Sequence, residues 1–192
     1  MDRAIGVVGM RVISGTAKGR KLQTVDGLDT RPTTDRMKET IFNMIAFDLL
    51  DCDFLDVFAG SGAMGIEALS RGAKSAVFVD YSADCQAMIL ENLRHTQLVE
   101  RAVVVKNGEV LSALLGLQKE EKTFHIIFLD PPYESELGGQ VLEAIATKKL
   151  LAEDGYVLFE HDTKKTVEAP EGMELFRQKK HPKTTISFYR SV

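Results

Sequence analysis

The chain has 192 residues, of which 44% are hydrophobic and 27% are charged, so it is long enough for one compact domain with a full core and too short for a second large domain. Its apolar runs fall short of the roughly eighteen residues of a transmembrane helix, and its N-terminus lacks a signal-peptide pattern, which predicts a cytoplasmic protein. Cys52 and Cys85 stand alone, without CxxC spacing or a neighbouring histidine pair, which argues against disulfide and zinc sites and predicts reduced, packed thiols.

The sequence predicts a short N-terminal segment followed by one domain. Residues 1–9 precede a second methionine and match no helix or strand period, so we expect them to be a tag or a flexible arm. We expect residues 10–192 to form a single domain, with an N-terminal extension over 10–52 and a core over 53–192.

The net charge of −4 conceals two basic segments. Residues 173–192 contain five basic residues and one acid, and residues 10–24 contain no acid and four basic residues: Arg11, Lys18, Arg20 and Lys21. Since nucleic-acid backbones bind to local positive charge, a phosphate-binding surface, if present, is expected to form from these two ends. Two solvated faces explain the same distribution equally well.

A helix is predicted within RPTTDRMKETIFNMIAFDLL, ahead of the sheet. Thr33 or Thr34 can cap this helix, and Asp35 favours its first turn. Its apolar residues follow helical spacing and are expected to dock on the core: Met37, Ile41, Met44, Ile45 and Leu49.

From Asp53 onward, apolar runs alternate with segments of helical period, which is typical of a parallel sheet covered by helices on both faces. Strands are predicted over 53–58, 75–80, 101–106, 124–129 and 154–160, and helices over 62–72, 82–97, 108–119 and 135–150. Several strands are almost continuously apolar, as expected for central parallel strands. Residues 172–192 read as two strands around the turn HPK and predict a terminal antiparallel hairpin.

The segment FLDVFAGSGAMGIEALSRGA places a strand, a glycine-rich turn and a helix in succession. Gly60, Gly62 and Gly65 have G-x-G-x-x-G spacing, which suits a backbone that approaches a ligand closely at a helix N-terminus. A dehydrogenase uses the same spacing for a pyrophosphate, and a purely structural turn also fits.

Two carboxylates near this turn refine the interpretation. Asp80 ends the following strand, where an acid can accept both hydroxyls of a ribose in either kind of cofactor. Asp56 lies within the first strand, where its charge would repel a pyrophosphate and attract a sulfonium or ammonium group. This favours S-adenosylmethionine over NAD. The alternative is that Asp56 accepts hydrogen bonds from local backbone donors.

The strongest signal is HIIFLD-PPY, in which Asp130, Pro131, Pro132 and Tyr133 leave the carboxyl end of a buried strand. The prolines end the strand and restrict the directions of the Asp130 side chain and the Pro131 carbonyl. Two acceptors aimed at the N–H bonds of an aromatic amine would localise its lone pair toward a methyl donor, and Tyr133 would stack on the extruded base. An ordinary strand-terminating turn is the alternative.

At these residues the sequence resembles the class I, Rossmann-like methyltransferases, and within them the small bacterial 16S ribosomal RNA guanine-N2 methyltransferases. The resemblance runs from MRVISGTAKGRKL through RPTTDRMKETIFN, DVFAGSGAMGIEALSRGA and FLDPPY to the terminal strands. The RPTTDRMKETIFN segment is the most specific to this family, because the other two motifs occur widely among amino-methylating enzymes. The resemblance implies an α/β fold with a mostly parallel seven-stranded sheet, helices on both faces and a C-terminal antiparallel hairpin.

The resemblance also implies the sites. The methionine part of S-adenosylmethionine is expected to contact Asp56, Phe58, Gly60, Ser61 and Gly62, and Asp80 with Tyr81 its ribose and adenine. Gly108 and Glu109 match the place where relatives contact the adenine edge. Asp130 matches both the cofactor site and, with Pro131, Pro132 and Tyr133, the clamp on the base. A segment that closes over cofactor and substrate matches Arg31, Thr33, Thr34 and Arg36.

The implied partner is 16S ribosomal RNA in a partly assembled small-subunit particle, with guanine 966 as the family's target and with no membrane or metal. The four histidines stand at no ligand-like spacing. Three other functions stay open. An adenine-N6 or protein-glutamine methyltransferase uses a similar clamp, although the DNA enzymes usually carry a recognition domain for which this chain has no room. A non-catalytic cofactor-binding assembly factor and an NAD-dependent dehydrogenase are the other two.

Overall fold

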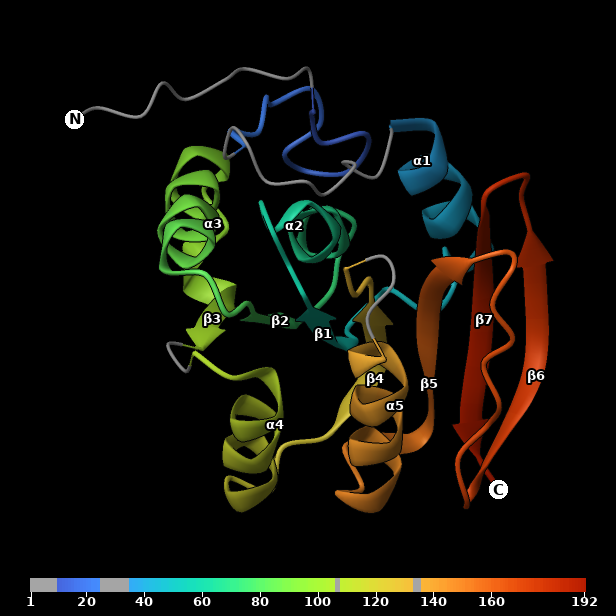
Figure 1. Cartoon of the computed structure of the whole chain (residues 1–192). Coiled ribbons are helices and arrows are strands. Elements are labelled where there is room, and N and C mark those ends of the chain that lie inside the picture. The colour runs from blue at the N-terminus through green and yellow to red at the C-terminus, as the bar shows by residue number, and fades with distance from the viewer. Residues whose placement is uncertain (1–9, 25–34, 106–107, 133–135) are drawn as a thin grey trace.

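The computed structural model describes residues 10–24, 35–105, 108–132 and 136–192. Its centre is one seven-stranded sheet of spatial order β3-β2-β1-β4-β5-β7-β6 (Figure 1). The strands are β1 (Asp53–Val57), β2 (Ser75–Val79), β3 (Ala102–Val105), β4 (Phe124–Leu129), β5 (Leu151–Asp162), β6 (Met173–Lys180) and β7 (Thr184–Ser191). The predicted sheet, mostly parallel and with an antiparallel hairpin at its C-terminal end, is confirmed.

Strand order reverses between β1 and β4. From β1, the chain first builds outward through β2 to β3, and then crosses back to place β4 on the other side of β1. These pairs and β4–β5 are parallel, whereas β7 lies antiparallel between β5 and β6. In open α/β sheets, ligands bind beyond the carboxyl ends of the strands at such a reversal.

Helices cover both faces of the sheet (Figure 1). On one face lie α1 (Asp35–Met44), α2 (Ala63–Ser70) and α3 (Ala83–Thr96), and on the other lie α4 (Val110–Lys119) and α5 (Leu137–Thr147). A short 3-10 turn, η1 (Val99–Arg101), precedes β3. Because strand residues alternate between the faces, Phe54 and Phe128 join one apolar cluster while Leu55 and Leu129 join the other. No helix in the described ranges has the length and hydropathy to cross a membrane.

The predicted helix face of the N-terminal extension is confirmed. Ile41, Ile45 and Leu49 are buried in the core, and Met37 and Met44 pack against it. The capping positions Thr33 and Thr34 lie outside the described residues.

The predicted strand over 154–160 differs most from the structure, in which β5 begins at Leu151. The start of β5 is irregular, since its register against β4 shifts between Phe124 and Ile126 and Asp154 has a φ of 61°. A Cβ on Gly155 would lie 2.8 Å from the Phe124 carbonyl oxygen, so a glycine fits where the two backbones approach. This irregularity interrupts the apolar pattern that marks the rest of the strand.

The two cysteines are free and buried, as predicted. Burial raises the pKa of the Cys52 thiol to about 12 and that of Cys85 to about 11, with nearby carboxylates adding to both shifts. Thiols with raised pKa values are poor nucleophiles, so both residues act through packing.

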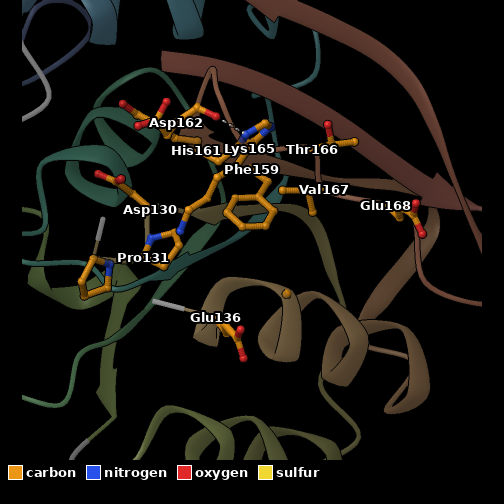
Figure 2. A pocket seen from close by; sticks show the side chains of 13 residues that line it. Asp130, Pro131, Glu136, Phe159, His161, Asp162, Lys165, Thr166, Val167 and Glu168 are labelled. Atoms are coloured by element: carbon orange, nitrogen blue, oxygen red, sulfur yellow. Dashed lines mark hydrogen bonds between the residues drawn. The ribbon is translucent and has the colours of Figure 1, made fainter. Parts of the chain in front are cut away.

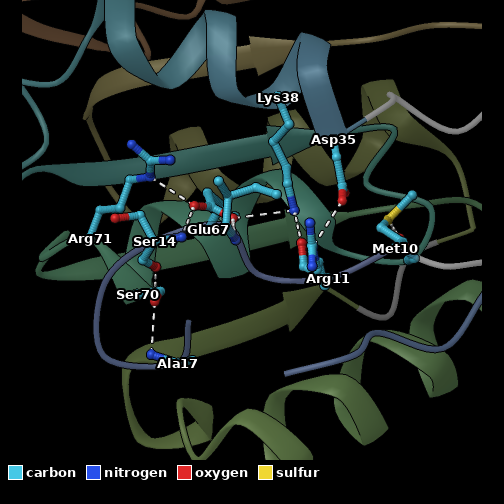
Figure 3. Close-up of polar contacts among 12 residues, drawn as sticks. Met10, Arg11, Ser14, Ala17, Asp35, Lys38, Glu67, Ser70 and Arg71 are labelled. Atoms are coloured by element: carbon cyan, nitrogen blue, oxygen red, sulfur yellow. Dashed lines mark hydrogen bonds and ion pairs between the residues drawn. The ribbon is translucent and has the colours of Figure 1, made fainter. Parts of the chain in front are cut away.

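The N-terminal extension docks on α2 through one buried carboxylate (Figure 3). Glu67, which is fully buried, accepts hydrogen bonds from the backbone N–H groups of Ile13 (2.8 Å) and Ser14 (2.9 Å). Its oxygens also lie 3.2 Å from Lys38 Nζ and 2.8 Å from Arg71 Nε. One side chain therefore joins residues 10–24, α1 and α2.

Lys38 is the equally buried partner from α1. Its ammonium group also donates a hydrogen bond to the Arg11 carbonyl. Burial lowers the pKa of Lys38, and the contact with Glu67 opposes that shift. A buried ammonium group of this kind depends on an opposite charge in contact with it, and Glu67 supplies that charge.

A backbone contact fixes the same segment on α2. Thr16 N donates to the Ser70 carbonyl (2.8 Å), and the Ser70 hydroxyl donates to the Ser14 carbonyl and accepts from Ala17 N. A Cβ on Gly15, which has a φ of 84°, would lie 1.8 Å from the Ser70 carbonyl oxygen. Gly15 is therefore required both by its backbone conformation and by this close approach.

We expect Glu67→Ala to lower the free energy of unfolding by about 3–5 kcal/mol, because it leaves the Lys38 ammonium buried without its partner. Urea denaturation measures this change. The matched control is Glu39→Ala on the exposed side of α1, which should change stability by less than about 0.5 kcal/mol. Equal, small effects of the two substitutions would show that the Glu67 cluster does not hold the extension.

Candidate functional site

Four acids lie along the carboxyl edge of four neighbouring strands. In spatial order from β2 through β1 and β4 to β5, they are Asp80, Asp56, Asp130 and Glu160. Asp130 follows the last residue of β4, whose register partner on β5 is Phe159, so Asp130 and Glu160 stand at the same level. The row crosses the strand-order reversal, where a ligand site is expected.

The glycine turn between β1 and α2 adopts left-handed backbone conformations. Phe58, Gly60 and Gly62 have φ values of 65°, 55° and 78°, and α2 starts directly after Gly62. A Cβ on Gly65 would lie 2.3 Å from the Phe78 ring, so this glycine lets α2 pack closely on β2. Phe58, predicted to end the first strand, lies instead in the turn and packs on the core.

Asp56 is 1% exposed, and its carboxylate accepts a hydrogen bond from the Gly65 N–H at 2.8 Å. The role of accepting from a local backbone donor is therefore confirmed for Asp56. Burial raises its pKa well above the ordinary range, the Gly65 bond opposes the rise, and the Asp130 and Asp80 carboxylates add to it. A positive charge nearby would stabilise the ionised form of Asp56.

Asp80 connects the end of β2 to the glycine turn. One of its oxygens accepts from Gly60 N at 2.8 Å, and the other accepts from Ser82 N at 2.9 Å. Ser82 caps α3 through its bond with Cys85 N. Tyr81, next to Asp80, is 57% exposed, so a ligand at this edge can reach its ring. The structure therefore brings Asp80 to the glycine turn, as predicted.

Ser61 connects the glycine turn to the N-terminal extension. Its hydroxyl contacts Met10 Sδ at 3.4 Å, and its carbonyl accepts from the buried Asn92 side chain at 2.9 Å. Asn92 also exchanges hydrogen bonds with the backbone of Gln23. The turn is thus held from both the extension and α3.

Gly108 and Glu109 precede α4, beyond the end of β3. Both are exposed, and Glu109 occupies the N-cap position of α4 without a side-chain capping bond. Nothing in its local contacts assigns its carboxylate a structural role within the described residues.

Asp130, Pro131 and Pro132 leave β4 and form one wall of a cavity of about 530 Å³ (Figure 2). Pro131 and Phe159 both press against α5, where a Cβ on Gly138 would lie 2.8 Å and 2.5 Å from their rings. Tyr133, the remaining residue of the motif, lies outside the described residues.

The cavity continues from β4 to β5 and the segment beyond it. Figure 2 shows Asp130 and Pro131 on one side and Thr166, Val167 and Glu168 on the other. The remaining lining residues are Pro132, Glu136, Gly139, Phe159, Glu160, His161, Asp162 and Lys165. Asp130 therefore stands between the acids beside the glycine turn and a cavity of small-molecule size.

The basic side chains of residues 10–24 differ in their surroundings. Arg11 pairs with Asp35 at 3.2 Å, and Arg20 donates to the His95 carbonyl and to Gln97. Lys18 and Lys21 are exposed, so they are the more available pair for a phosphate backbone.

Other predicted substrate-binding residues are only partly described. Arg36 is exposed on the first turn of α1, and Arg31, Thr33 and Thr34 lie outside the described residues. In Figure 1, α1 separates residues 10–24 from the β6–β7 hairpin. The two basic segments therefore do not adjoin in this view, and a shared phosphate surface stays a prediction.

Sequence reasoning missed the β5 wall of the cavity. Glu160, His161 and Asp162 end a strand at the same sheet edge as Asp130, and that position was the available signal. Among the described residues, no group of three or more His, Cys, Asp or Glu side chains is arranged to hold a metal ion.

The pKa of Glu160 leads to a testable pH dependence of stability. Burial and the Asp130 carboxylate raise it from an ordinary value of 4.5 to about 8. Between these values the folded protein holds a proton that the unfolded chain has released, so raising the pH favours unfolding, and the loss is complete above the folded-state pKa.

We therefore expect Glu160→Gln to gain thermal stability relative to the unaltered protein as the pH rises from about 5 to about 8, with no further gain above that range. Melting temperatures of both proteins across this range measure the effect. Glu153→Gln, an exposed position on the same strand, should give a difference that is constant with pH. A constant difference for Glu160→Gln would contradict the raised pKa.

Comparison with known proteins gives the family. A family model described as "Conserved hypothetical protein 95" matches residues 10–190. The chain is 42% identical over 184 residues to "Putative rRNA methyltransferase YlbH" of Bacillus subtilis (strain 168), covering 94% of this chain and 98% of that one. It is 33% identical over 171 residues to "Ribosomal RNA small subunit methyltransferase D" of Escherichia coli (strain K12), covering 88% and 84% of the two chains.

Solved structures agree with these matches. The structure described as "Putative methyltransferase yhhF from Escherichia coli" superposes with a TM-score of 0.79 at 34% sequence identity, covering 94% of this chain and 97% of that one. The sheet order, the glycine turn and the proline-bounded end of β4 thus occur together in a chain that matches the family model over almost its whole length. The chain belongs to the Conserved hypothetical protein 95 family, in which it groups with ribosomal RNA methyltransferases.

Proposed function

We propose that this chain transfers a methyl group from S-adenosylmethionine to the exocyclic N2 amino group of a guanine in 16S ribosomal RNA. The observation that carries the proposal is the position of Asp130 and Pro131. They lie between the acids beside the glycine turn, Asp56 and Asp80, and an open cavity. Ribosomal RNA as the substrate class is supported by the family, whose matched relatives are named for ribosomal RNA methylation.

The acids fit the charge of the cofactor. Burial raises the pKa values of Asp56 and Glu160, the Asp130 carboxylate adds to both rises, and a cationic ligand would relieve this repulsion. S-adenosylmethionine carries sulfonium and ammonium groups, and it supplies an electrophilic methyl group when bound. A pyrophosphate would instead add negative charge to the same edge. The acid row therefore favours S-adenosylmethionine over NAD.

Individual residues have distinct proposed roles in holding the cofactor. Asp80 and Tyr81 would bind the ribose and adenine, and Asp56 would act through its charge and by fixing Gly65. The methionine part would lie against Phe58, Gly60, Ser61, Gly62 and Asp130, and the adenine edge against Gly108 and Glu109. Because Asp80 already accepts from Gly60 N, ribose binding would use its remaining acceptor capacity or displace that bond.

The clamp acts on the amine through two acceptors. Asp130 and the Pro131 carbonyl would accept its two N–H bonds, which localises the nitrogen lone pair for attack. The amine loses one proton when it gains the methyl group, and the Asp130 carboxylate would accept that proton. Phe159 in the cavity wall, together with Tyr133, would provide aromatic surface for the extruded base.

The N-terminal extension is proposed to close over the ligands. Its residues 10–24 contact the glycine turn through Met10, and α1 is fixed on α2 through Lys38 and Glu67. Arg31, Thr33, Thr34 and Arg36 would then act from a segment with both flanks anchored. The proposed domain division is an extension over 10–52 and a core over 53–192, with 1–9 as a tag or a flexible arm.

The deciding experiment locates the methyl group. Small-subunit particles and free 16S RNA from a bacterial strain lacking this activity are incubated with the protein and isotopically labelled S-adenosylmethionine, and the modified nucleoside is identified by mass spectrometry. We expect N2-methylguanosine at guanine 966, with the particle as the better substrate. Label on adenine, on protein or nowhere would overturn the proposal.

We expect Asp130→Ala to reduce turnover by about 10²–10³-fold, because the amine loses one of its two acceptors. Calorimetry should show that the variant still binds S-adenosylmethionine, since the glycine turn and Asp80 are unchanged. Glu91→Ala, an exposed acid on α3, is the matched control and should keep wild-type turnover. Wild-type turnover of Asp130→Ala would end the clamp hypothesis.

We expect Lys18→Gln with Lys21→Gln to weaken RNA binding and to reduce the slope of log K against log salt by about 1 for each lost phosphate contact. Binding titrations at several salt concentrations measure both changes. Lys119→Gln with Lys122→Gln removes the same charge from the end of α4, on the opposite face of the sheet, and should leave the slope unchanged. Identical slopes for both double variants would show that the N-terminal lysines do not contact phosphate.

A further inference from the structure

Glu160 is a buried carboxyl group to which the clamp assigns no role. It lies near the carboxyl end of β5, is 8% exposed and lines the cavity beside Asp130. Within the part of the chain that the structure describes, its Oε2 atom has no hydrogen-bond partner. Buried polar atoms without partners are rare and costly, so this oxygen in a cavity wall indicates a ligand that supplies a donor.

Glu160 and Asp130 approach the cavity together. They are the next residues after the register pair Leu129 and Phe159 on adjacent parallel strands. The pKa of Glu160 rises to about 8 through burial first and the Asp130 carboxylate second. A ligand held by Asp130 therefore lies within the electrostatic reach of Glu160.

The other ionisable groups of the cavity are differently placed. The His161 ring nitrogens already contact Ser187 Oγ at 2.8 Å and the Asp162 carbonyl at 3.0 Å. Glu136, Lys165 and Glu168 are exposed, and Asp162 accepts a hydrogen bond from Lys164 N. Glu160 is the described lining carboxyl group that combines burial with an unpartnered oxygen.

The edge of guanine supplies the matching donor. Its N2 amino group is adjacent to the ring N1–H, so two neighbouring atoms both donate hydrogen bonds. Adenine and cytosine carry an unprotonated ring nitrogen beside their amino groups. An acceptor placed next to an amine clamp therefore distinguishes guanine from the other amino-bearing bases, because it would face a lone pair on either of them.

We propose that Glu160 determines base specificity, with its carboxyl oxygen accepting the N1–H of the guanine whose N2 amino group is held by Asp130 and the Pro131 carbonyl. This inference rests on the proposed function and adds a second contact with the same base, at N1–H, to the clamp on its N2 amino group. It gives the unpartnered oxygen a donor and explains why a second carboxyl group stands beside the clamp despite the repulsion between them.

The test compares two RNAs that differ only in the base at the methylated position. Small-subunit RNA is ligated from fragments that carry either guanine or 2-aminopurine at the methylated position and is assembled into particles. 2-Aminopurine keeps the exocyclic 2-amino group, replaces N1–H by a lone pair and lacks the C6 carbonyl oxygen, so the comparison with the Glu160→Gln variant isolates the contribution of N1–H. Assays at about pH 8.5 favour the ionised form of the Glu160 carboxyl group, which can only accept hydrogen bonds.

We expect the unaltered protein to prefer guanine over 2-aminopurine in kcat/KM by about 10- to 100-fold, because the analogue leaves a buried acceptor unpaired. Glu160→Gln presents an amide that can accept or donate, so its preference should fall to within about threefold of unity. Glu153→Gln, exposed on the same strand and outside the cavity, should keep the full preference. A Glu160→Gln variant that keeps the full preference overturns the inference.

If the Glu160→Gln variant has too little turnover for kinetics, binding measurements test the same preference. The fluorescence of 2-aminopurine and competition by the guanine RNA give the affinity ratio without any methyl transfer. The same loss of preference in affinity supports the assignment, and an unchanged ratio overturns it. If the unaltered protein does not methylate the guanine RNA, the proposed function itself fails. If it methylates that RNA and the preference for guanine does not depend on Glu160, only the present inference fails.

Discussion

The reversal of strand order between β1 and β4 is the constraint on which the site depends. Parallel pairing in register, with Val57 opposite Leu129, forces the glycine turn and the proline-bounded segment to leave the sheet side by side. Burial raises the pKa of Asp56, and the Asp130 carboxylate is thereby held close enough to add to that rise by repulsion. The backbone hydrogen bonds of the sheet hold this repulsion in place, and a cationic ligand is the simplest chemical means of relieving it.

The N-terminal extension is joined to the core by buried ion pairs and hydrogen bonds. Glu67 is fully buried. It forms ion pairs with Lys38 and Arg71 and accepts hydrogen bonds from two backbone N–H groups. Replacing a buried carboxylate of this kind by a purely apolar contact would hold the segments less specifically, since charge and hydrogen-bond geometry select one arrangement. The Glu67 cluster also helps to position the extension against the glycine turn, because Met10 in the same segment contacts Ser61.

Much of the fold could be predicted from the sequence because the central strands and helices have strong periodic patterns; the strand over 124–129 matched exactly the β4 bounds found. The glycine turn, Asp80 and the DPP segment were also predictable, since local spacing places them at strand ends. Glu67 and Asn92 were not, because their roles arise from contacts with residues distant in sequence, as in the bond between Glu67 and Ile13. The unpartnered oxygen of Glu160 was not predictable either, because it depends on the surroundings that the fold gives that side chain. An isolated acid in an apolar strand or helix does not reveal what lies opposite it.

The position of β7 between β5 and β6 links the cavity to the order in which the chain is synthesised. Until Thr184–Ser191 has emerged, β5 has one uncovered edge, and the residues that form the cavity wall lack their neighbours: Glu160 lies opposite Ile186, and His161 lies opposite Thr185 and bonds Ser187. The glycine turn, at residues 58–62, is therefore synthesised well before the strand that covers the β5 wall of the cavity. The cavity wall on β5 is therefore completed by the last strand of the chain to be synthesised.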